Sequence, residues 1–218
     1  MPTLGPANPD RDAHIEGLNP TYNYGQRNTL WLDWLTTAAS RVLLAWDVSS
    51  IPEGAVVTNA TLNFVIQTNA LSASTNYSAY AINPQYGTND HFTEGSGTGS
   101  ATGDGATWQT YDGSSSWNDP GADSDYDTLT RTLFTVNTSD TTAGIEVTAT
   151  VQGALDNYRD NNGFIALLLK RDNESGSLQS LRFWSNQAVN PANRPVLTID
   201  YVVPSGTSGS LMLLGAGR

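Results

Sequence analysis

The segment from Arg41 to Gln67, RVLLAWDVSSIPEGAVVTNATLNFVIQ, contains two apolar runs separated by a polar turn and a Pro-Glu-Gly loop. The second run includes ATLNFVIQ at residues 60–67, in which every even position is apolar. A period of two is that of a β-strand with one face on a core and the other towards water. The segment therefore predicts strands of an antiparallel β-sandwich.

Similar strand-like segments recur along the chain, with Gly, Asn, Ser and Pro at the joints between them. Many short strands separated by turn residues are typical of a sandwich or jelly roll. We predict an all-β fold, an antiparallel jelly-roll β-sandwich with one short helix and a long loop insertion. Strands are expected near residues 30–35, 41–47, 56–67, 77–82, 129–136, 144–147, 164–170, 178–184 and 196–202.

The short helix is expected after residue 146. A spacing of 3.6 residues would place on one helix face the apolar residues Val147, Val151, Ala154, Leu155 and Tyr158. The sequence Asn-Asn-Gly at 161–163 then supplies a stop signal. We expect this helix to plug one open end of the sandwich.

Chain length and composition allow a single domain. A chain of 218 residues buries roughly 70% or more of its unfolded surface, so it needs neither metals nor disulfides to form a core. Cysteine is absent, which excludes disulfides and thiol chemistry. We divide the chain into an extended, proline-rich leader at 1–11, a sandwich domain at 12–203, and a linker with an apolar tail at 204–218.

The charge of the chain restricts its partners. Ten basic and 21 acidic residues give a net charge of −11, and a phosphate backbone would be repelled by it, so we expect no nucleic-acid partner. The N-terminus, MPTLGPANPDRD, lacks the basic start and apolar core of a signal peptide. No run of about 18 apolar residues occurs, so we expect no membrane span and no Sec signal.

Residue types that could carry catalysis are sparse. The sequence has no G-x-S-x-G motif, and only His14 and His91 could act as an imidazole base. A glycosidase needs two carboxylates about 5 to 9 Å apart, and sequence spacing in a sandwich does not identify such a pair. We therefore predict a protein that is not an enzyme and that uses no cofactor and no metal.

Two loop motifs bear on ligand binding. Asp123, Asp125 and Asp127 alternate as in the first half of a calcium loop, but the glycine and the later glutamate of an EF-hand are missing. A solvated acidic loop is the preferred interpretation, and calcium binding stays open. The glycine-rich run 95–105 matches no phosphate-binding motif and is expected to be a flexible loop.

The long insertion, residues 85–128, is the first place to look for a site, because loops of this length inside a compact domain are usually functional or mobile. It contains Trp108, Tyr111, Trp117 and Tyr126. Flat aromatic rings can stack on the apolar face of a sugar, so these four residues are the candidate carbohydrate-binding site. The alternative is that Trp108 and Trp117 anchor the core or the loop.

With these residues in view, the chain resembles the DNRLRE family, also called disaggregatase-related repeats. The resemblance covers nearly the whole chain, and Phe92 stands where the family usually has Trp. It implies a jelly-roll β-sandwich and, because some members are treated as carbohydrate-binding modules, polysaccharide as a partner. The motifs that carry it are the opening at 12–30 with Asn23-Tyr24-Gly25, the signature at 41–64, Phe92-Thr93-Glu94-Gly95, Gly105-Ala106-Thr107-Trp108, and the closing strand Arg194 to Tyr201.

The apolar end of the chain suggests assembly. Residues 204–209 read as a linker, and Leu211, Met212, Leu213 and Leu214 follow. Burying these four side chains would contribute roughly 6 to 12 kcal/mol, whereas ordering the backbone costs about 1 to 2 kcal/mol for each residue. The tail is therefore expected to fray unless a partner subunit holds it, and these four residues are the candidate assembly contacts.

Together these features predict a non-enzymatic structural protein of a larger assembly. A short chain with a DNRLRE-like jelly roll and a Gly/Leu-rich end resembles a virion component of a tailed bacteriophage, such as a capsid decoration, tail or fibre protein. Its partners would be other virion subunits and copies of itself in a homo-oligomer, and its location the virion. The alternative is an extracellular, lectin-like carbohydrate-binding module that uses the 85–128 loop.

Overall fold

The structure is a computed structural model, and it describes residues 2–35, 37–85 and 90–205. The elements in chain order are β1 (Thr3–Ala7), β2 (Arg11–Glu16), β3 (Thr29–Trp31), β4 (Ser40–Asp47), β5 (Val56–Ala70), β6 (Thr75–Ala81), β7 (Thr132–Val136), β8 (Thr142–Glu146), α1 (Thr148–Asn157), β9 (Phe164–Arg171), β10 (Ser180–Trp184), a 3-10 turn η1 (Pro191–Asn193) and β11 (Val196–Val202).

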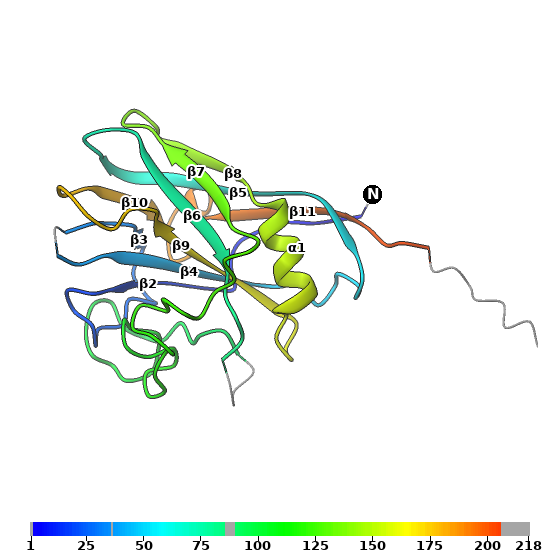
Figure 1. Cartoon of the computed structure of the whole chain (residues 1–218), viewed down its shortest axis with the longest axis horizontal. Coiled ribbons are helices and arrows are strands. Elements are labelled where there is room, and N and C mark those ends of the chain that lie inside the picture. The colour runs from blue at the N-terminus through cyan, green and yellow to red at the C-terminus, as the bar shows by residue number, and fades with distance from the viewer. Residues whose placement is uncertain (1, 36, 86–89, 206–218) are drawn as a thin grey trace, which may run out of the picture.

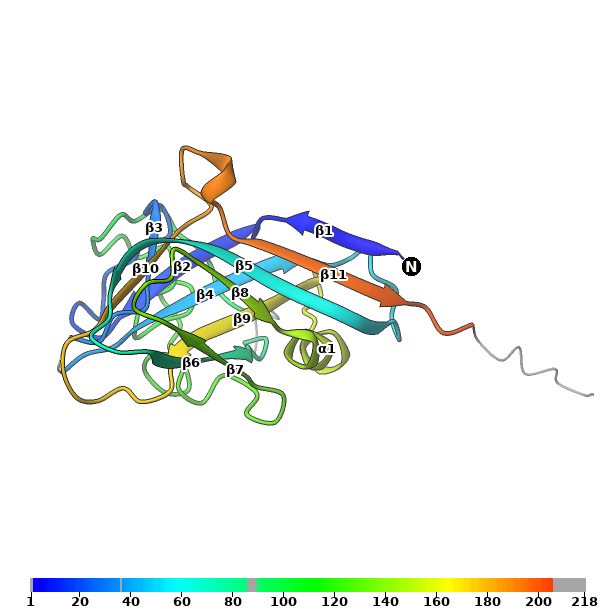
Figure 2. The same cartoon turned by 90° about the horizontal axis from the view of Figure 1, so that it is seen from above.

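These strands form two antiparallel sheets that face each other as a sandwich (Figures 1 and 2). The six-stranded sheet has the order β1-β11-β5-β10-β3, with β8 also paired to β5. The five-stranded sheet has the order β2-β4-β9-β6-β7. The predicted all-β sandwich with one short α-helix is confirmed for the described part of the chain.

The main core lies between the sheets. In β5 the predicted alternation is observed, because Ala60, Leu62 and Phe64 are buried while Asn63 and Gln67 are exposed. The helix α1 contacts β5 of one sheet and β6 and β9 of the other, so it closes one end of the sandwich, as Figure 2 shows.

Two strands were not among those expected. Strand β1 lies in the segment 1–11, which was predicted to be an extended leader, and it pairs antiparallel with β11. Strand β2 pairs with β4 in the other sheet. Neither segment shows a long alternating pattern, because β1 contains Pro6 and β2 is buried on both faces.

Strand β4 is also buried on both faces. Leu44 and Trp46 enter the main core, whereas Leu43 and Ala45 point to the opposite side of the sheet, into a second hydrophobic core. That second core is completed by side chains from residues 83–131, which we call the cover segment: Phe92, Ala106, Tyr111, Trp117 and Ala122. The green loops below β2 and β4 in Figure 1 are this third layer.

Buried polar contacts fix the cover segment in place. The Asn23 side chain is fully buried, and its amide nitrogen donates to the carbonyl oxygens of Glu94 (2.7 Å) and Ala106 (2.9 Å). Its amide oxygen accepts from the N–H of Gly97 at 2.7 Å. A Cβ atom at Gly97 would lie 2.5 Å from the Asn23 carbonyl oxygen, so glycine is required by close packing. The run expected to be a flexible loop is thus packed around one asparagine.

The double burial of β4 generates a test with a matched pair. Leu43 and Leu44 are adjacent and both 0% exposed, but they face different cores. Leu43→Ala and Leu44→Ala should each lower the free energy of unfolding by about 2 to 5 kcal/mol, because each leaves a cavity. Urea unfolding measures this, with Leu133→Ala on β7, where Leu133 is 52% exposed, as the control. A near-neutral Leu43→Ala would contradict the second core.

Candidate functional site

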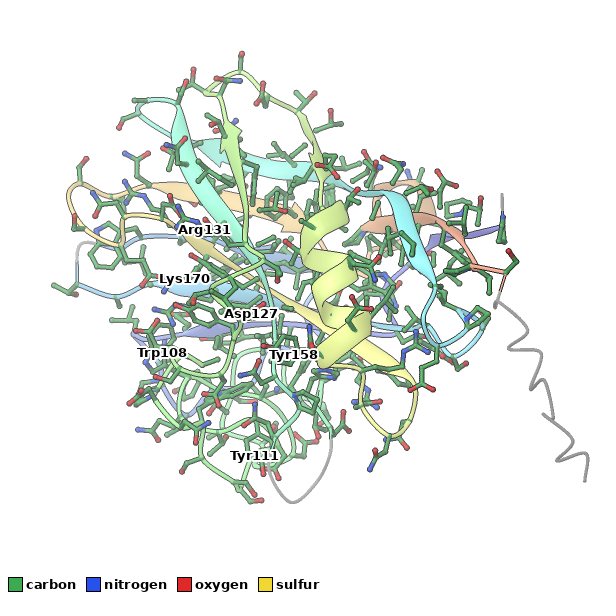
Figure 3. The ribbon with its side chains drawn as sticks, turned by 45° about the vertical axis from the view of Figure 1, so that its right-hand side comes forward. Trp108, Tyr111, Asp127, Arg131, Tyr158 and Lys170 are labelled. Atoms are coloured by element: carbon green, nitrogen blue, oxygen red, sulfur yellow. The ribbon has the colours of Figure 1, made fainter. Side chains whose placement is uncertain are left out.

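The structure separates the four predicted aromatic residues into two pairs. Tyr111 and Trp117 are 7% and 4% exposed and pack in the second core, with ring centroids 5.8 Å apart in an edge-on contact. The Trp117 indole N–H donates to the carbonyl oxygen of Thr107 at 2.9 Å. Trp108 and Tyr126 are half-buried at the margin of the same core. Figure 3 shows Tyr111 and Trp108 among the loops of the cover segment.

Trp108 is held against β4 by Arg41. The Arg41 guanidinium carbon lies 4.9 Å from the Trp108 ring centroid. Nε and Nη2 donate to the two carboxylate oxygens of Glu174 at 2.9 and 2.7 Å, while Nη1 donates to the Gly121 carbonyl at 2.7 Å. Such bidentate pairs are strong and fix geometry. A Cβ at Gly121 would lie 2.6 Å from the Trp108 ring, so Gly121 packs closely against one side of the ring.

Tyr126 is held in a related way by Lys170. The Lys170 ammonium lies 5.3 Å from the Tyr126 ring centroid and 2.8 Å from Asp123 Oδ1. Asp123 also contacts Arg41 Nη1 at 3.0 Å, so it links the two cations. Partial burial opposes it, but the hydrogen bond from Lys170 and the charge of Arg41 hold the pKa of Asp123 below its ordinary value. We call Arg41, Trp108, Asp123, Tyr126, Lys170 and Glu174 the Arg41 cluster.

The three alternating aspartates do not form the solvated loop that was predicted, because Asp125 and Asp127 are 1% and 8% exposed. The three side chains serve different partners. Asp123 belongs to the Arg41 cluster, whereas Asp125 accepts from Asn118 and Asp127 accepts from the Leu129 N–H and the Thr130 hydroxyl. Among the described residues, the group of side chains close enough to share a metal is a different one, Asp90, His91 and Asp160. Calcium binding by the aspartates at 123, 125 and 127 stays an open question.

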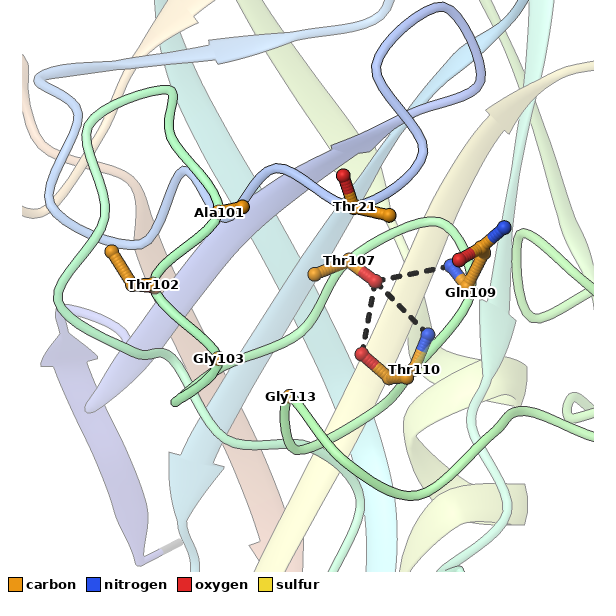
Figure 4. Close-up of a pocket in the computed structure, with 8 residues that line it drawn as sticks. All are labelled: Thr21, Ala101, Thr102, Gly103, Thr107, Gln109, Thr110 and Gly113. Atoms are coloured by element: carbon orange, nitrogen blue, oxygen red, sulfur yellow. Dashed lines mark hydrogen bonds between the residues drawn. The ribbon is translucent and has the colours of Figure 1, made fainter.

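A hollow of about 300 Å³ lies within the cover segment, with Thr21 also on its wall (Figure 4). The Thr107 hydroxyl lies 2.9 Å from the Thr110 hydroxyl and accepts from the N–H groups of Gln109 and Thr110 at 3.1 and 3.0 Å. Hydroxyl and amide groups of this kind can hydrogen-bond a polar ligand, but they offer no ring for stacking. The lining residues are Thr21, Ala101, Thr102, Gly103, Thr107, Gln109, Thr110 and Gly113.

A second hollow, of about 360 Å³, lies near the start of β6 and the end of β9. It is also lined by hydroxyl, amide and charged groups, namely Ser74, Thr75, Asn76, Arg171, Asp172 and Asn173. Neither hollow contains the four aromatic residues predicted to bind carbohydrate. That binding role stays a prediction, and its exposed surface would have to come from Trp108 and Tyr126.

Two carboxyl groups lie together where the cover segment meets β2, Glu94 from the cover segment and Asp12 from β2. Asp12 is 0% exposed, its N–H donates to Glu94 Oε1 at 3.2 Å, and its Oδ2 accepts from the Asn186 N–H at 2.6 Å. Gln187 donates to Glu94 at 2.7 Å. Burial, with a smaller contribution from the Glu94 charge, raises the pKa of Asp12 to about 8, and burial also raises the pKa of Glu94. Burial thus favours the neutral, protonated form of Asp12.

Sequence comparison adds no relative to this description. A comparison with known protein families and with curated proteins finds no match. The DNRLRE resemblance thus stays a prediction. Among the described residues, no helix has the length and the apolar composition needed to cross a membrane.

The predicted assembly contacts, Leu211, Met212, Leu213 and Leu214, lie outside the described residues. The structure does describe the point from which this tail departs. Val202 pairs with Val56 at the end of the six-stranded sheet, and Val56 and Val203 are 46% and 50% exposed. The last described residues of the chain therefore lie beside exposed apolar side chains.

The buried carboxyl pair predicts a pH dependence of stability. The folded chain keeps the Asp12 proton up to about pH 8, whereas the unfolded chain loses it near its ordinary pKa of 3.8. The free energy of unfolding should therefore fall as pH rises through this window, by up to about 1.4 kcal/mol per pH unit from this group. Asp12→Asn should remove that contribution. In urea unfolding at pH 5, 6.5 and 8, the free energy of unfolding of the variant should therefore rise relative to that of the wild type as the pH increases. Parallel pH profiles would contradict the assignment.

Proposed function

We propose that the protein is a non-enzymatic structural protein of a larger assembly, with the virion of a bacteriophage as its expected setting. The observation that carries the proposal is the second hydrophobic core. The cover segment, where a site would most readily be built, seals the outer face of β4 and β9 instead. Together with α1 at one end of the sandwich, it gives a stiff body suited to repeated packing against neighbours.

The distribution of charge supports the same proposal. Each basic residue in the described chain contacts a carboxylate, a backbone carbonyl or an aromatic ring of its own chain; they are Arg11, Arg27, Arg41, Arg131, Arg159, Lys170, Arg171, Arg182 and Arg194. With a net charge of −11, the outward charge is mainly acidic, so close association needs contacts that are not ionic.

Exposed apolar side chains supply such contacts. Leu129 and Leu133 are 91% and 52% exposed at or near β7, which is an edge strand of the five-stranded sheet. Val56 and Val203 are exposed where the tail departs. We propose that the tail of one copy, residues 211–214, covers exposed apolar side chains of a neighbouring copy, because burial there offsets the cost of ordering the tail.

A carbohydrate-binding module remains the second candidate. It is favoured by the half-buried rings of Trp108 and Tyr126 in the Arg41 cluster and by the hydroxyl-lined hollow within the cover segment. Sugar recognition commonly combines one stacking ring with several hydrogen bonds. Both candidates assume the same domain and differ in the surface that binds the partner. Assembly would use the tail and the exposed apolar side chains, whereas sugar binding would use Trp108, Tyr126 and the hollow.

Removal of the tail tests the assembly proposal. The full chain at micromolar concentration should form an oligomer of defined mass by light scattering, whereas a chain ending at Ser205 should be monomeric with an unchanged far-UV spectrum. A full-length variant with Leu211→Ser, Met212→Ser, Leu213→Ser and Leu214→Ser keeps the chain length and should also be monomeric, because the apolar contact is lost.

A monomeric full chain would count against assembly through the tail. If that monomer bound a polysaccharide on a glycan array, and Trp108→Ala weakened binding at least tenfold, the carbohydrate-binding candidate would replace it. Trp117→Ala is the matched control, since Trp117 is buried and its truncation should lower stability rather than affinity selectively.

A further inference from the structure

Asp90, His91 and Asp160 bring three potential ligand atoms together at the junction of two segments. Asp90 and His91 belong to the cover segment, whereas Asp160 follows α1. One ligand atom from each residue lies within 4.8 Å of the others. The His91 and Asp160 side chains are 1% and 0% exposed, and Asp90 lies at the solvent side with 26% exposure.

The hydrogen bonds of His91 define which ring nitrogen is available. His91 Nε2 lies 2.7 Å from the carbonyl oxygen of Tyr158. A carbonyl accepts only, so Nε2 carries the proton. In the neutral ring Nδ1 then has a lone pair, and among the described residues it has no hydrogen-bond partner. Histidines that bind metals commonly donate their other N–H to a carbonyl in this way.

Asp160 presents a matching oxygen. Its Oδ1 accepts from the N–H groups of Asn162 and Phe164 at 2.9 and 2.8 Å, which fixes the carboxylate in the turn before β9. Its Oδ2 has no hydrogen-bond partner in the described chain and lies 3.6 Å from His91 Nδ1. His91 Nδ1 and Asp160 Oδ2 thus face each other in a buried position.

The distance from His91 Nδ1 to Asp160 Oδ2 can be compared with the lengths expected of a hydrogen bond and of two ligands that share a metal ion. A direct N–H···O bond is 2.7 to 3.2 Å long, so 3.6 Å is too long for one. Two ligands about 2.0 to 2.2 Å from a tetrahedral zinc ion are about 3.4 Å apart. The observed spacing is therefore long for a hydrogen bond and compatible with two ligands on a common ion.

We propose that Asp90, His91 and Asp160 form a binding site for a divalent transition-metal ion, with Zn²⁺ as the best match. Imidazole and carboxylate ligands suit zinc. Three protein ligands leave a position for water. The bound ion would cross-link the cover segment to the turn between α1 and β9. This inference does not rest on the proposed function.

Asp90 is the ligand least available to a metal ion, because other groups already contact its carboxylate. Its Oδ1 already contacts Arg11 Nη1 and accepts from the His91 N–H at 2.9 Å. The Arg11 guanidinium also donates to the Phe92 carbonyl at 3.0 Å. Its positive charge opposes a cation and makes Asp90 the ligand whose loss should matter least, whereas Asp160 and His91 should dominate affinity.

The test is calorimetric titration of the full chain, purified with a chelator and then dialysed, with ZnCl₂ alone. We expect one Zn²⁺ per chain, and a Tm rise of about 5 to 10 °C at a free metal concentration 100 times Kd. Asp160→Asn keeps the Oδ1 acceptor, and His91→Gln keeps a donor for the Tyr158 carbonyl. Each variant should weaken Zn²⁺ binding at least tenfold. Asp156→Asn, which removes an exposed carboxylate on α1, should not.

Failure of the wild type to bind Zn²⁺ would overturn the proposal, as would equal affinity in Asp160→Asn and the wild type. Nitrogen-15 NMR of the two histidines gives an independent readout. Binding should shift the His91 Nδ1 resonance, and the buried His14 serves as the internal control. A His91 ring protonated on both nitrogens and unaffected by Zn²⁺ would assign the pair to a simple imidazolium–carboxylate contact.

Discussion

Burial of strand β4 on both faces is the constraint on which the rest of the structure depends. Leu44 and Trp46 require the opposite sheet, whereas Leu43 and Ala45 require another cover. Each fully buried leucine is worth roughly 1.5 to 3 kcal/mol relative to exposure, so leaving the outer face open would be costly. The 83–131 segment supplies that cover without helices or strands of its own among its described residues.

A cover made of loops lacks extended strand pairing to hold it, and buried polar residues hold it instead through hydrogen bonds and a cation–π contact. Asn23 donates hydrogen bonds to the backbone of the cover segment, Arg41 packs on the Trp108 ring, and the Asp12 N–H donates to Glu94. The proposed metal site would add a tie at the end of α1. These groups are the residue types that often mark catalysis, but here their partners are other parts of the same chain. A rigid body that acts through its surface is consistent with this use of charge.

The sequence predicted those features that have a local pattern. The alternation in β5, the apolar face of α1 and most strands were predicted correctly, because each depends on side-chain period. The continuous apolar run at 42–46 was predicted only as a sandwich strand; its burial on both faces was not predicted, and the run does not identify the cover. The structural roles of Asn23 and Asp12, and the place of Asp160 beside His91, were not predicted, because a single polar residue has no period and these partners are distant in sequence. The roles of Trp108 and Trp117 stayed ambiguous for the same reason.

Hydrogen exchange measured by mass spectrometry tests the central claim most directly. The Thr93 and Ala106 amides in the cover segment donate to the carbonyls of Tyr111 (2.9 Å) and Thr93 (2.8 Å). If the cover and the sheet share one core, peptides containing these amides should exchange as slowly as those of β4 and β9, through global unfolding. Exchange of the cover peptides within seconds, with β4 and β9 still protected, would show that the cover opens independently and would contradict the account.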